Sequence, residues 1–199
     1  MGEAVRPSAA PSRAVPRGRL LVLSGPSGVG KTVVAERLLL DPRFGRAITA
    51  TTRAPRAGER DGVDYHFLTV EEFRRRLAAG WFLEHAEVYG RLYGTPVASV
   101  EDLRAAGRHC LLVIDVQGAA TLRRQGVDAL FVFLDPPSLD ELARRLAGRD
   151  GVDSPAFLKR MAAAATELAQ APTFDCRVIN LEIEDAARKV AACAGVTLQ

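Results

Sequence analysis

Short apolar runs alternate with longer segments of mixed polarity over most of this chain. The runs have the length of buried strands, whereas the mixed segments carry apolar residues at helical spacing. Strands that alternate with helices indicate βαβ units, and hence a parallel sheet covered on both faces. The expected strands are 20–23, 109–114, 129–134 and 176–179, and the expected helices are 33–40, 96–106, 119–124, 138–147, 155–169 and 184–194. We therefore predict an α/β fold with a parallel sheet at its centre.

The segment 47–90 breaks this alternation. It holds three β-prone pieces, 47–50, 64–68 and 82–88, around one helical stretch, 70–79. Such a segment predicts a small mixed or antiparallel sheet inserted into the α/β core.

Residues 1–18 differ from the rest, because they are rich in Pro, Ala, Ser and Arg and have no periodicity. We expect a disordered basic tail here and a single domain over 19–199. The tail lacks the apolar stretch of a secretory signal, and Arg6 occupies the Ser/Thr position of the myristoylation pattern. An organelle transit peptide stays open as an alternative, since such segments are also rich in Arg and Ser.

The composition narrows the class of protein. Apolar residues make up 48% of the 199 positions, enough for a substantial core, yet no window approaches the ~18 consecutive apolar residues of a membrane span. The net charge of +3 is compatible with nucleic-acid binding. However, the arginines are scattered among acids, and a small anionic substrate explains them equally well. We expect a monomer or small homo-oligomer without a nucleic-acid or membrane partner.

Three cysteines, Cys110, Cys176 and Cys193, stand far apart without a C-x-x-C pair. This spacing argues against a disulfide framework or a zinc site. The chain is therefore interpreted as a reduced, cytoplasmic protein.

The strongest local signal for chemistry is a glycine-rich loop between an expected strand and an expected helix. Its sequence, SGPSGVGKT at 24–32, fits the phosphate-binding pattern G-x-x-x-x-G-K-[ST]. The glycines allow backbone N–H groups to surround a phosphate at the N-terminus of the helix. Lys31 adds a charge at the β/γ-phosphates, and the Thr32 hydroxyl is placed to bind Mg²⁺. The residues predicted to bind ATP here are Gly25, Pro26, Ser27, Gly28, Val29, Gly30, Lys31 and Thr32.

Two further segments carry candidate chemistry. The apolar strand 110–114 ends in Asp115, where a carboxylate can serve the metal directly or through water, although Asp also caps turns at this position. In the stretch 49–56, Arg53 and Arg56 stand three residues apart beside threonines, which suits a phosphate other than the triphosphate.

Six motifs, in this order, resemble the guanylate kinase family from about residue 20 to the C-terminal helix. They are the SGPSGVGKT loop, TTR-x-PR-x-GE with G-x-DY-x-F, F-x-E at 82–84, YGT at 93–95, IDVQGA at 114–119 and R-R-L-x-x-R at 144–149. The resemblance implies a P-loop core with an inserted GMP-binding subdomain at 47–95 and a helical lid at about 138–170. It also implies Mg²⁺-dependent transfer of the γ-phosphate of ATP to GMP, and to dGMP, giving the diphosphate and ADP.

By position in the family motifs, Arg53, Arg56, Tyr65 and Tyr93 would hold the GMP phosphate, while Thr49, Glu84 and Thr95 would read the base. Guanine offers two adjacent donors, N1–H and the 2-amino group, which one carboxylate such as Glu84 can accept together. The resemblance further implies that Asp115 contacts GMP, that Arg145, Arg149 and Arg160 close over the transferred phosphoryl group, and that Asn180 lies near adenine.

One position departs from the family pattern. Relatives usually carry a second acid two residues before Asp115, where this chain has Val113. Residues 113 and 115 share a face of the strand, so a carboxylate is missing from the side that faces the site. A slower, less selective or specialised guanylate kinase paralogue is one alternative that this difference raises.

Three other classes of function compete with a guanylate kinase. A scaffold module that binds proteins without catalysis would typically lose the phosphate loop, which is intact here. A sister kinase of phosphorylated sugars would keep the loop but lose Glu84 and the TTR-x-PR run, and both are present. A basic nucleic-acid binder has no motif to support it.

Overall fold

The computed structural model describes residues 16–88, 90–152 and 154–198, and its central element is a parallel sheet. The strand order is β2-β7-β1-β8-β9, and every neighbouring pair runs parallel. The bounds are β1 Leu20–Ser24, β2 Phe44–Arg46, β7 His109–Val113, β8 Leu130–Asp135 and β9 Cys176–Ile179. The predicted α/β fold is therefore confirmed, and the carboxyl ends of these strands face one edge of the sheet, where α/β proteins bind ligands.

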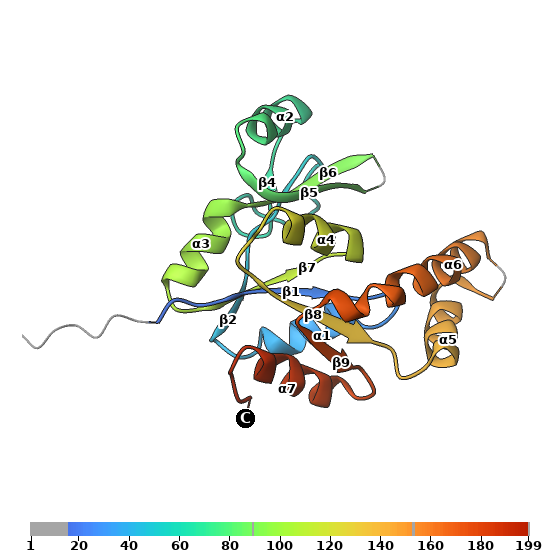
Figure 1. Ribbon diagram of the computed structural model, residues 1–199. Coiled ribbons are helices and arrows are strands. Elements are labelled where there is room, and N and C mark those ends of the chain that lie inside the picture. Colours follow the sequence, from blue (N-terminus) through green and yellow to red (C-terminus); the bar gives the residue numbers. More distant parts are fainter. Residues whose placement is uncertain (1–15, 89, 153, 199) are drawn as a thin grey trace, which may run out of the picture.

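Successive side chains of β1 point to opposite faces of the sheet, and both sets are apolar and covered by helices. Leu21 and Leu23 pack with helices α1, Lys31–Leu38, and α7, Ile183–Cys193. Leu20 and Val22 point to the opposite face and pack with α3, Val97–Ala105, and α4, Val116–Arg124. Figure 1 shows α1 and α7 on one side of the sheet and α4 on the other. The two layers bury almost the whole of β1, which places the following loop on a rigid support.

A second, smaller sheet lies above the core in Figure 1 and has the order β4-β3-β6-β5. The bounds are β3 Ala50–Thr51, β4 His66–Phe67, β5 Phe82–Val88 and β6 Arg91–Pro96. The pair β3–β4 is parallel, whereas β3–β6 and β5–β6 are antiparallel, so the predicted mixed sheet is confirmed. Helix α2, Val70–Ala78, covers it through Phe73, whose ring stacks on Phe82 at 4.4 Å between centroids.

Helices α5, Leu139–Asp150, and α6, Pro155–Ala169, form an arm that projects from the core in Figure 1. Each begins at a serine N-cap: the Ser138 hydroxyl accepts a hydrogen bond from the backbone N–H of Glu141, and Ser154 accepts one from that of Phe157. The buried side chains Leu142 and Leu146 hold the base of α5 in the main core. The short 3-10 helix η1, Ala171–Thr173, then leads into β9.

Two strands were missed by the sequence pattern. β2 has only three residues and no readable alternation, and β6 coincides with the YGT motif. β2 pairs with the distant strand β7, whereas β6 pairs with its neighbour in the chain, β5, and with the distant strand β3. The predicted tail lies outside the described residues up to residue 15. Among the helices that the structure describes, none is both long and apolar enough to cross a membrane.

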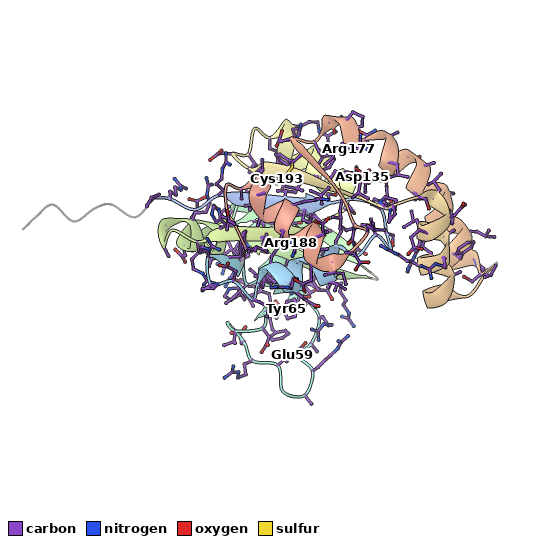
Figure 2. The ribbon with its side chains drawn as sticks, turned by 90° about the horizontal axis from the view of Figure 1, so that it is seen from below. Glu59, Tyr65, Asp135, Arg177, Arg188 and Cys193 are labelled. Atoms are coloured by element: carbon purple, nitrogen blue, oxygen red, sulfur yellow. A yellow bond between two sulfur atoms is a disulfide. The ribbon has the colours of Figure 1, made fainter. Side chains whose placement is uncertain are left out.

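The expectation of a chain without disulfides is wrong. Cys176 of β9 and Cys193 of α7 form a disulfide, with a Cα–Cα distance of 6.5 Å. The two residues are 17 positions apart and meet because α7 packs back against β9. Figure 2 labels Cys193 on this helix. Spacing in the sequence does not reveal such a pair, since the distance depends on how the helix docks. Cys110 is free and buried.

Candidate active site

The phosphate-binding loop connects β1 to α1, as its motif predicts. Gly25, Gly28 and Gly30 all have positive φ angles, of 140°, 82° and 101°. A Cβ at Gly25 would lie 2.3 Å from the Leu134 carbonyl oxygen, and one at Gly30 would lie 2.5 Å from Nδ2 of Asn180. The glycines are therefore required both for backbone conformation and for close approach to neighbouring strands.

Lys31, the first residue of α1, folds back over the loop. Its Nζ donates hydrogen bonds to the carbonyl oxygens of Gly25 at 2.6 Å and Pro26 at 3.0 Å. Burial lowers the pKa of the ammonium group, while the charges of Glu167 and Asp115 oppose this shift. The carbonyls hold the cation at the mouth of the loop, where an anion could exchange with them as a partner.

The side chains of Asn180 and Arg145 donate hydrogen bonds to the backbone of this loop. The Asn180 side-chain amide donates to the Val29 carbonyl oxygen at 2.7 Å, and Arg145 reaches the same oxygen at 3.3 Å. Arg145 also donates to the Asn180 carbonyl at 3.2 Å and to the Glu141 carboxylate at 2.7 Å. Both side chains were predicted as ligand contacts; here Asn180 donates to the protein backbone, and Arg145 donates to the backbone and to Glu141.

The position of Asn180 depends on its strand. Asp135 at the end of β8 accepts two hydrogen bonds from Arg177 of β9, at 3.0 and 3.1 Å. The Asp135 carbonyl oxygen also accepts from the Asn180 N–H at 2.9 Å. Figure 2 shows Asp135 and Arg177 on adjacent strands. This pairing continues β9 beyond the sheet, so that Asn180 lies against the loop.

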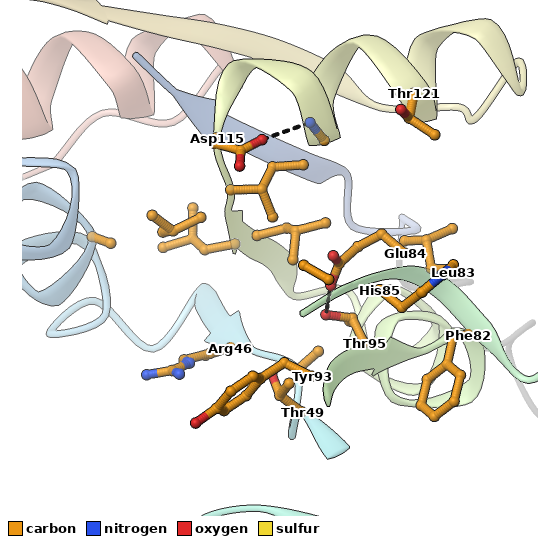
Figure 3. Close-up of a pocket in the computed structure, with 18 of the residues that line it drawn as sticks. Arg46, Thr49, Phe82, Leu83, Glu84, His85, Tyr93, Thr95, Asp115 and Thr121 are labelled. Atoms are coloured by element: carbon orange, nitrogen blue, oxygen red, sulfur yellow. Dashed lines mark hydrogen bonds between the residues drawn. The ribbon is translucent and has the colours of Figure 1, made fainter. Parts of the chain in front are cut away.

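A cavity of about 770 Å³ lies between the core sheet and the small sheet. It is lined by elements from both, including the ends of α1 and β7 on one side and β5 and β6 on the other. Figure 3 shows this close-up. Seven of the predicted site residues line it: Thr32, Thr49, Tyr65, Glu84, Tyr93, Thr95 and Asp115. The fold thus collects residues from 32 to 115 around one space.

Glu84 is the largely buried acid of this cavity. Its Oε1 accepts a hydrogen bond of 2.6 Å from the Thr95 hydroxyl, which Figure 3 draws as a dashed line. The pairing of β5 with β6 places the two residues opposite one another. Burial raises the pKa of the Glu84 carboxyl, and the hydrogen bond from Thr95 opposes part of that rise.

The two predicted phosphate-binding arginines lie outside the cavity lining. Arg53 forms a bidentate pair with Glu59, at 2.8 and 2.9 Å, and this carboxylate raises the pKa of the guanidinium. The backbone N–H of Arg56 donates to the same carboxylate at 2.7 Å. Figure 2 shows Glu59 and Tyr65 in the loop that extends from the core. In this arrangement Glu59 accepts the hydrogen bonds from the two Arg53 Nη atoms that a phosphate would need.

The aromatic residues link this loop to the cavity. The Arg53 guanidinium lies 5.3 Å from the Tyr65 ring centroid, and the Tyr65 ring lies 6.4 Å from that of Tyr93. Tyr93 also contributes to the raised pKa of Arg53. The two tyrosines are only partly buried, and both line the cavity.

Asp115 has one of the two roles that the sequence left open, that of a cap, and its role as a metal ligand stays a prediction. It is the N-cap of α4, with Oδ1 accepting from the Gly118 N–H at 2.7 Å, and its side chain also faces the cavity. Val113, two residues earlier, is 38% exposed and lines the same cavity. Val113 and Asp115 thus both line the cavity, although β7 ends at Val113 and strand alternation does not extend to Asp115. Thr32 and Asp115 supply oxygen ligands of the kind that Mg²⁺ prefers.

The arm carries the remaining predicted residues. Arg145 touches the loop, as described above. Arg160 lies on α6, and its Nη1 is buried. The Arg149 side chain lies outside the described part of the structure. The arm is anchored close to the loop, since a Cβ on Gly28 would meet Leu146 of α5 at 2.7 Å.

Several polar side chains at or near the cavity were not predicted, among them Glu59, Arg46 and Glu36. Glu59 is part of the GE motif but was not assigned a contact, although its position three residues after Arg56 was a usable signal. Arg46 and Glu36 line the cavity from β2 and α1. Neither belongs to a motif, and only the docking of β2 beside β7 brings Arg46 to this space.

Comparisons with known proteins agree with this geometry. The sequence model of the guanylate kinase family matches residues 17–194. The chain is 45% identical over 178 residues to a guanylate kinase of Clostridium perfringens, covering 88% of this chain and 82% of the relative. It is 49% identical over 178 residues to one of Streptomyces kasugaensis, covering 88% and 86%.

A solved structure extends this match to three dimensions. The crystal structure of guanylate kinase from Anaplasma phagocytophilum superposes with a TM-score of 0.66 at 36% identity, covering 90% of this chain and 86% of that one. Sequence and fold thus match over nearly the whole described chain, and the P-loop and the cavity lie where the family's motifs predict them. The chain belongs to the guanylate kinase family.

Proposed function

We propose that this protein is a guanylate kinase that transfers the γ-phosphoryl group of ATP to GMP, releasing ADP and GDP, and that it also accepts dGMP. One observation carries the proposal beyond family membership. A single cavity has Thr32, the last residue of the phosphate-binding loop, at one side and the partly buried Glu84 with its hydrogen-bonded Thr95 at the other. Such a space can hold a nucleotide monophosphate with its phosphate directed at the loop.

Base recognition would rest on Glu84. Ionised Glu84 accepts from guanine N1–H and the 2-amino group, with the Thr95 hydroxyl fixing one carboxylate oxygen. Adenine has an unprotonated N1 at that position, so an acceptor would meet an acceptor. Because the carboxylate is mostly buried, the mismatch is not relieved by water. Thr49 lines the same cavity and would complete the contacts to the base.

Phosphoryl transfer needs positioning and charge neutralisation more than proton transfer. The acceptor is a phosphate monoester with a second pKa of about 6, so its oxygen is already anionic near neutral pH. That oxygen bonds to the γ-phosphorus, the bond to the β–γ bridging oxygen breaks, and ADP leaves with the electron pair. The Lys31 ammonium group, which now donates to the Gly25 and Pro26 carbonyl oxygens, would donate to the β/γ-phosphate oxygens instead.

A magnesium ion fits the oxygen donors at the loop. Thr32 and Asp115 would hold it, Asp115 directly or through water, and the ion would neutralise charge on the β- and γ-phosphates. Arg53, Arg56, Tyr65 and Tyr93 would hold the acceptor phosphate, which requires Arg53 to exchange Glu59 for phosphate. The insertion 47–95 and the arm at 138–170, with Arg145, Arg149 and Arg160, would close over the substrates and exclude water.

An assay of ADP release tests this function. Purified protein is given ATP with GMP, dGMP, AMP, UMP or a panel of phosphosugars, each with and without Mg²⁺, and the Lys31→Ala variant serves as the inactive control. We expect ADP release with GMP and dGMP only, dependent on Mg²⁺, and reduced by about 100-fold or more in the variant. Turnover of a phosphosugar in preference to GMP would overturn the proposal.

A further inference from the structure

Arg46 faces the cavity from an element that no motif marks. It is the last residue of β2 and pairs in register with Leu111 of β7. Val113 follows two residues later on β7, so the side chains of Arg46 and Val113 point to the same face of the sheet. Both line the cavity, together with Thr32 of α1. Figure 3 shows the Arg46 guanidinium at the side of the cavity toward which the Tyr93 hydroxyl also points.

The guanidinium is exposed and has no ion-pair or hydrogen-bond partner within the described residues. Val113 offers it only an apolar surface at the neighbouring position. Glu36 and Asp115 line the same cavity, but neither forms an ion pair with Arg46 in the part of the chain that the structure describes. An arginine that faces a ligand cavity without a competing carboxylate is available to an anionic ligand.

Arg46 differs in this respect from Arg53, whose guanidinium is occupied by Glu59. Arg46 is also the one arginine among the described residues that line the cavity. An acceptor phosphate in this space could therefore contact Arg46 from the core side without displacing a protein carboxylate, whereas a contact with Arg53 would displace Glu59. Guanidinium and phosphate form charge-assisted, often bidentate hydrogen bonds.

We propose that Arg46 is a further binding residue for the phosphate monoester of the acceptor nucleotide, contacting it from the core side of the cavity. The inference rests on the proposed function and adds to it a contact outside the family's motifs. The valine at position 113 favours this contact. A carboxylate there would lie on the same face as the guanidinium and compete with the phosphate for it.

Binding measurements with and without the phosphate isolate this contact. GMP and guanosine are titrated by calorimetry into the wild type, Arg46→Gln and Arg46→Lys, in the absence of ATP. Arg74 on α2 is exposed and lies outside the cavity lining, so Arg74→Gln is the matched control for the loss of one positive charge. Circular dichroism and thermal unfolding establish that each variant is folded.

We expect Arg46→Gln to weaken GMP binding by about 10-fold or more while leaving guanosine binding unchanged. Arg46→Lys should restore part of the loss, and Arg74→Gln should bind both ligands as the wild type does. Equal loss for GMP and guanosine, or no loss for either, would overturn the role of Arg46. The proposed function fails separately, if the wild type binds GMP but does not phosphorylate it.

Discussion

The side-chain amide of Asn180 donates a 2.7 Å hydrogen bond to the backbone carbonyl of Val29, so the end of β9 holds the phosphate-binding loop. Asn180 is only 3% exposed, and its Oδ1 is buried without a partner among the described residues. The contact connects the last strand of the sheet to a loop that follows the first. It makes the conformation of the loop depend on residues about 150 positions away in the sequence.

We expect Asn180→Ala to weaken ATP binding more than GMP binding, because the Val29 carbonyl keeps only its long hydrogen bond to Arg145. The expected loss of stability is about 1–3 kcal/mol, as for a buried hydrogen bond with an unsatisfied partner. Thermal unfolding and the KM values for the two nucleotides test this. Asn180→Asp is the matched variant, since it keeps the shape but removes the donor, and it should behave at least as poorly. An unchanged KM for ATP in both variants would contradict the role of this contact.

Glu84→Gln tests base recognition. The amide can accept one of guanine's two hydrogen bonds but presents a donor to the other. The transition state with GMP should therefore lose about 2–4 kcal/mol of stabilisation, which lowers kcat/KM for GMP. Discrimination between GMP and AMP should fall with it. Thr95→Val is a useful companion, because it removes only the hydroxyl that orients Glu84 and should have a smaller effect of the same kind. A variant Glu84→Gln with wild-type selectivity would remove this residue from base recognition.

The raised pKa of Glu84 predicts a pH dependence. As pH falls through this pKa, the carboxyl gains a proton and loses its ability to accept both guanine donors. The kcat/KM for GMP should therefore decline on the acid side at a higher pH than an ordinary glutamate would cause. A pH–rate profile measures the acid limb, which should flatten in Glu84→Gln.

The raised pKa of Glu84 affects stability in the opposite direction: kcat/KM for GMP should rise with pH, whereas the free energy of unfolding should fall. The folded chain binds the Glu84 proton more tightly than the unfolded chain, so its contribution to stability falls as pH rises from the unfolded pKa to the folded one. Near neutral pH, Glu84→Gln should be at least as stable as the wild type. A strongly destabilised variant would show that Glu84 serves the fold rather than the ligand.

The disulfide gives a prediction about stability. Closing the loop of 17 residues between Cys176 and Cys193 should stabilise the fold by about 3 kcal/mol, so reductant and Cys193→Ser should each lower the melting temperature. Cys110→Ser is the control, because this thiol is buried and its pKa is raised by burial to about 11. Thiol titration of the denatured, unreduced protein should detect Cys110 alone. Detection of all three thiols before reduction would contradict the bond.

The local sequence was sufficient to predict those parts of the protein whose structure and function depend on contiguous residues. The loop 24–32 could be predicted in full, because its glycines, Lys31 and Thr32 act through the backbone geometry of one strand–loop–helix unit. The apolar runs predicted the central strands for a related reason: strands of a doubly covered parallel sheet must be apolar on both faces, as β1 is. The family motifs added Glu84, Tyr65 and Tyr93, which the structure brings to one cavity.

Tertiary structure decided the contacts between distant segments. The attachment of Asn180 and Arg145 to Val29 and the Cys176–Cys193 bond depend on how elements dock, which the spacing of residues does not encode. Arg46 is the clearest case, because its place at the cavity follows from the pairing of a three-residue strand with β7. The sequence by itself determined the class of fold and the phosphate-binding loop, whereas packing determined which charges are already paired and which remain available to a substrate.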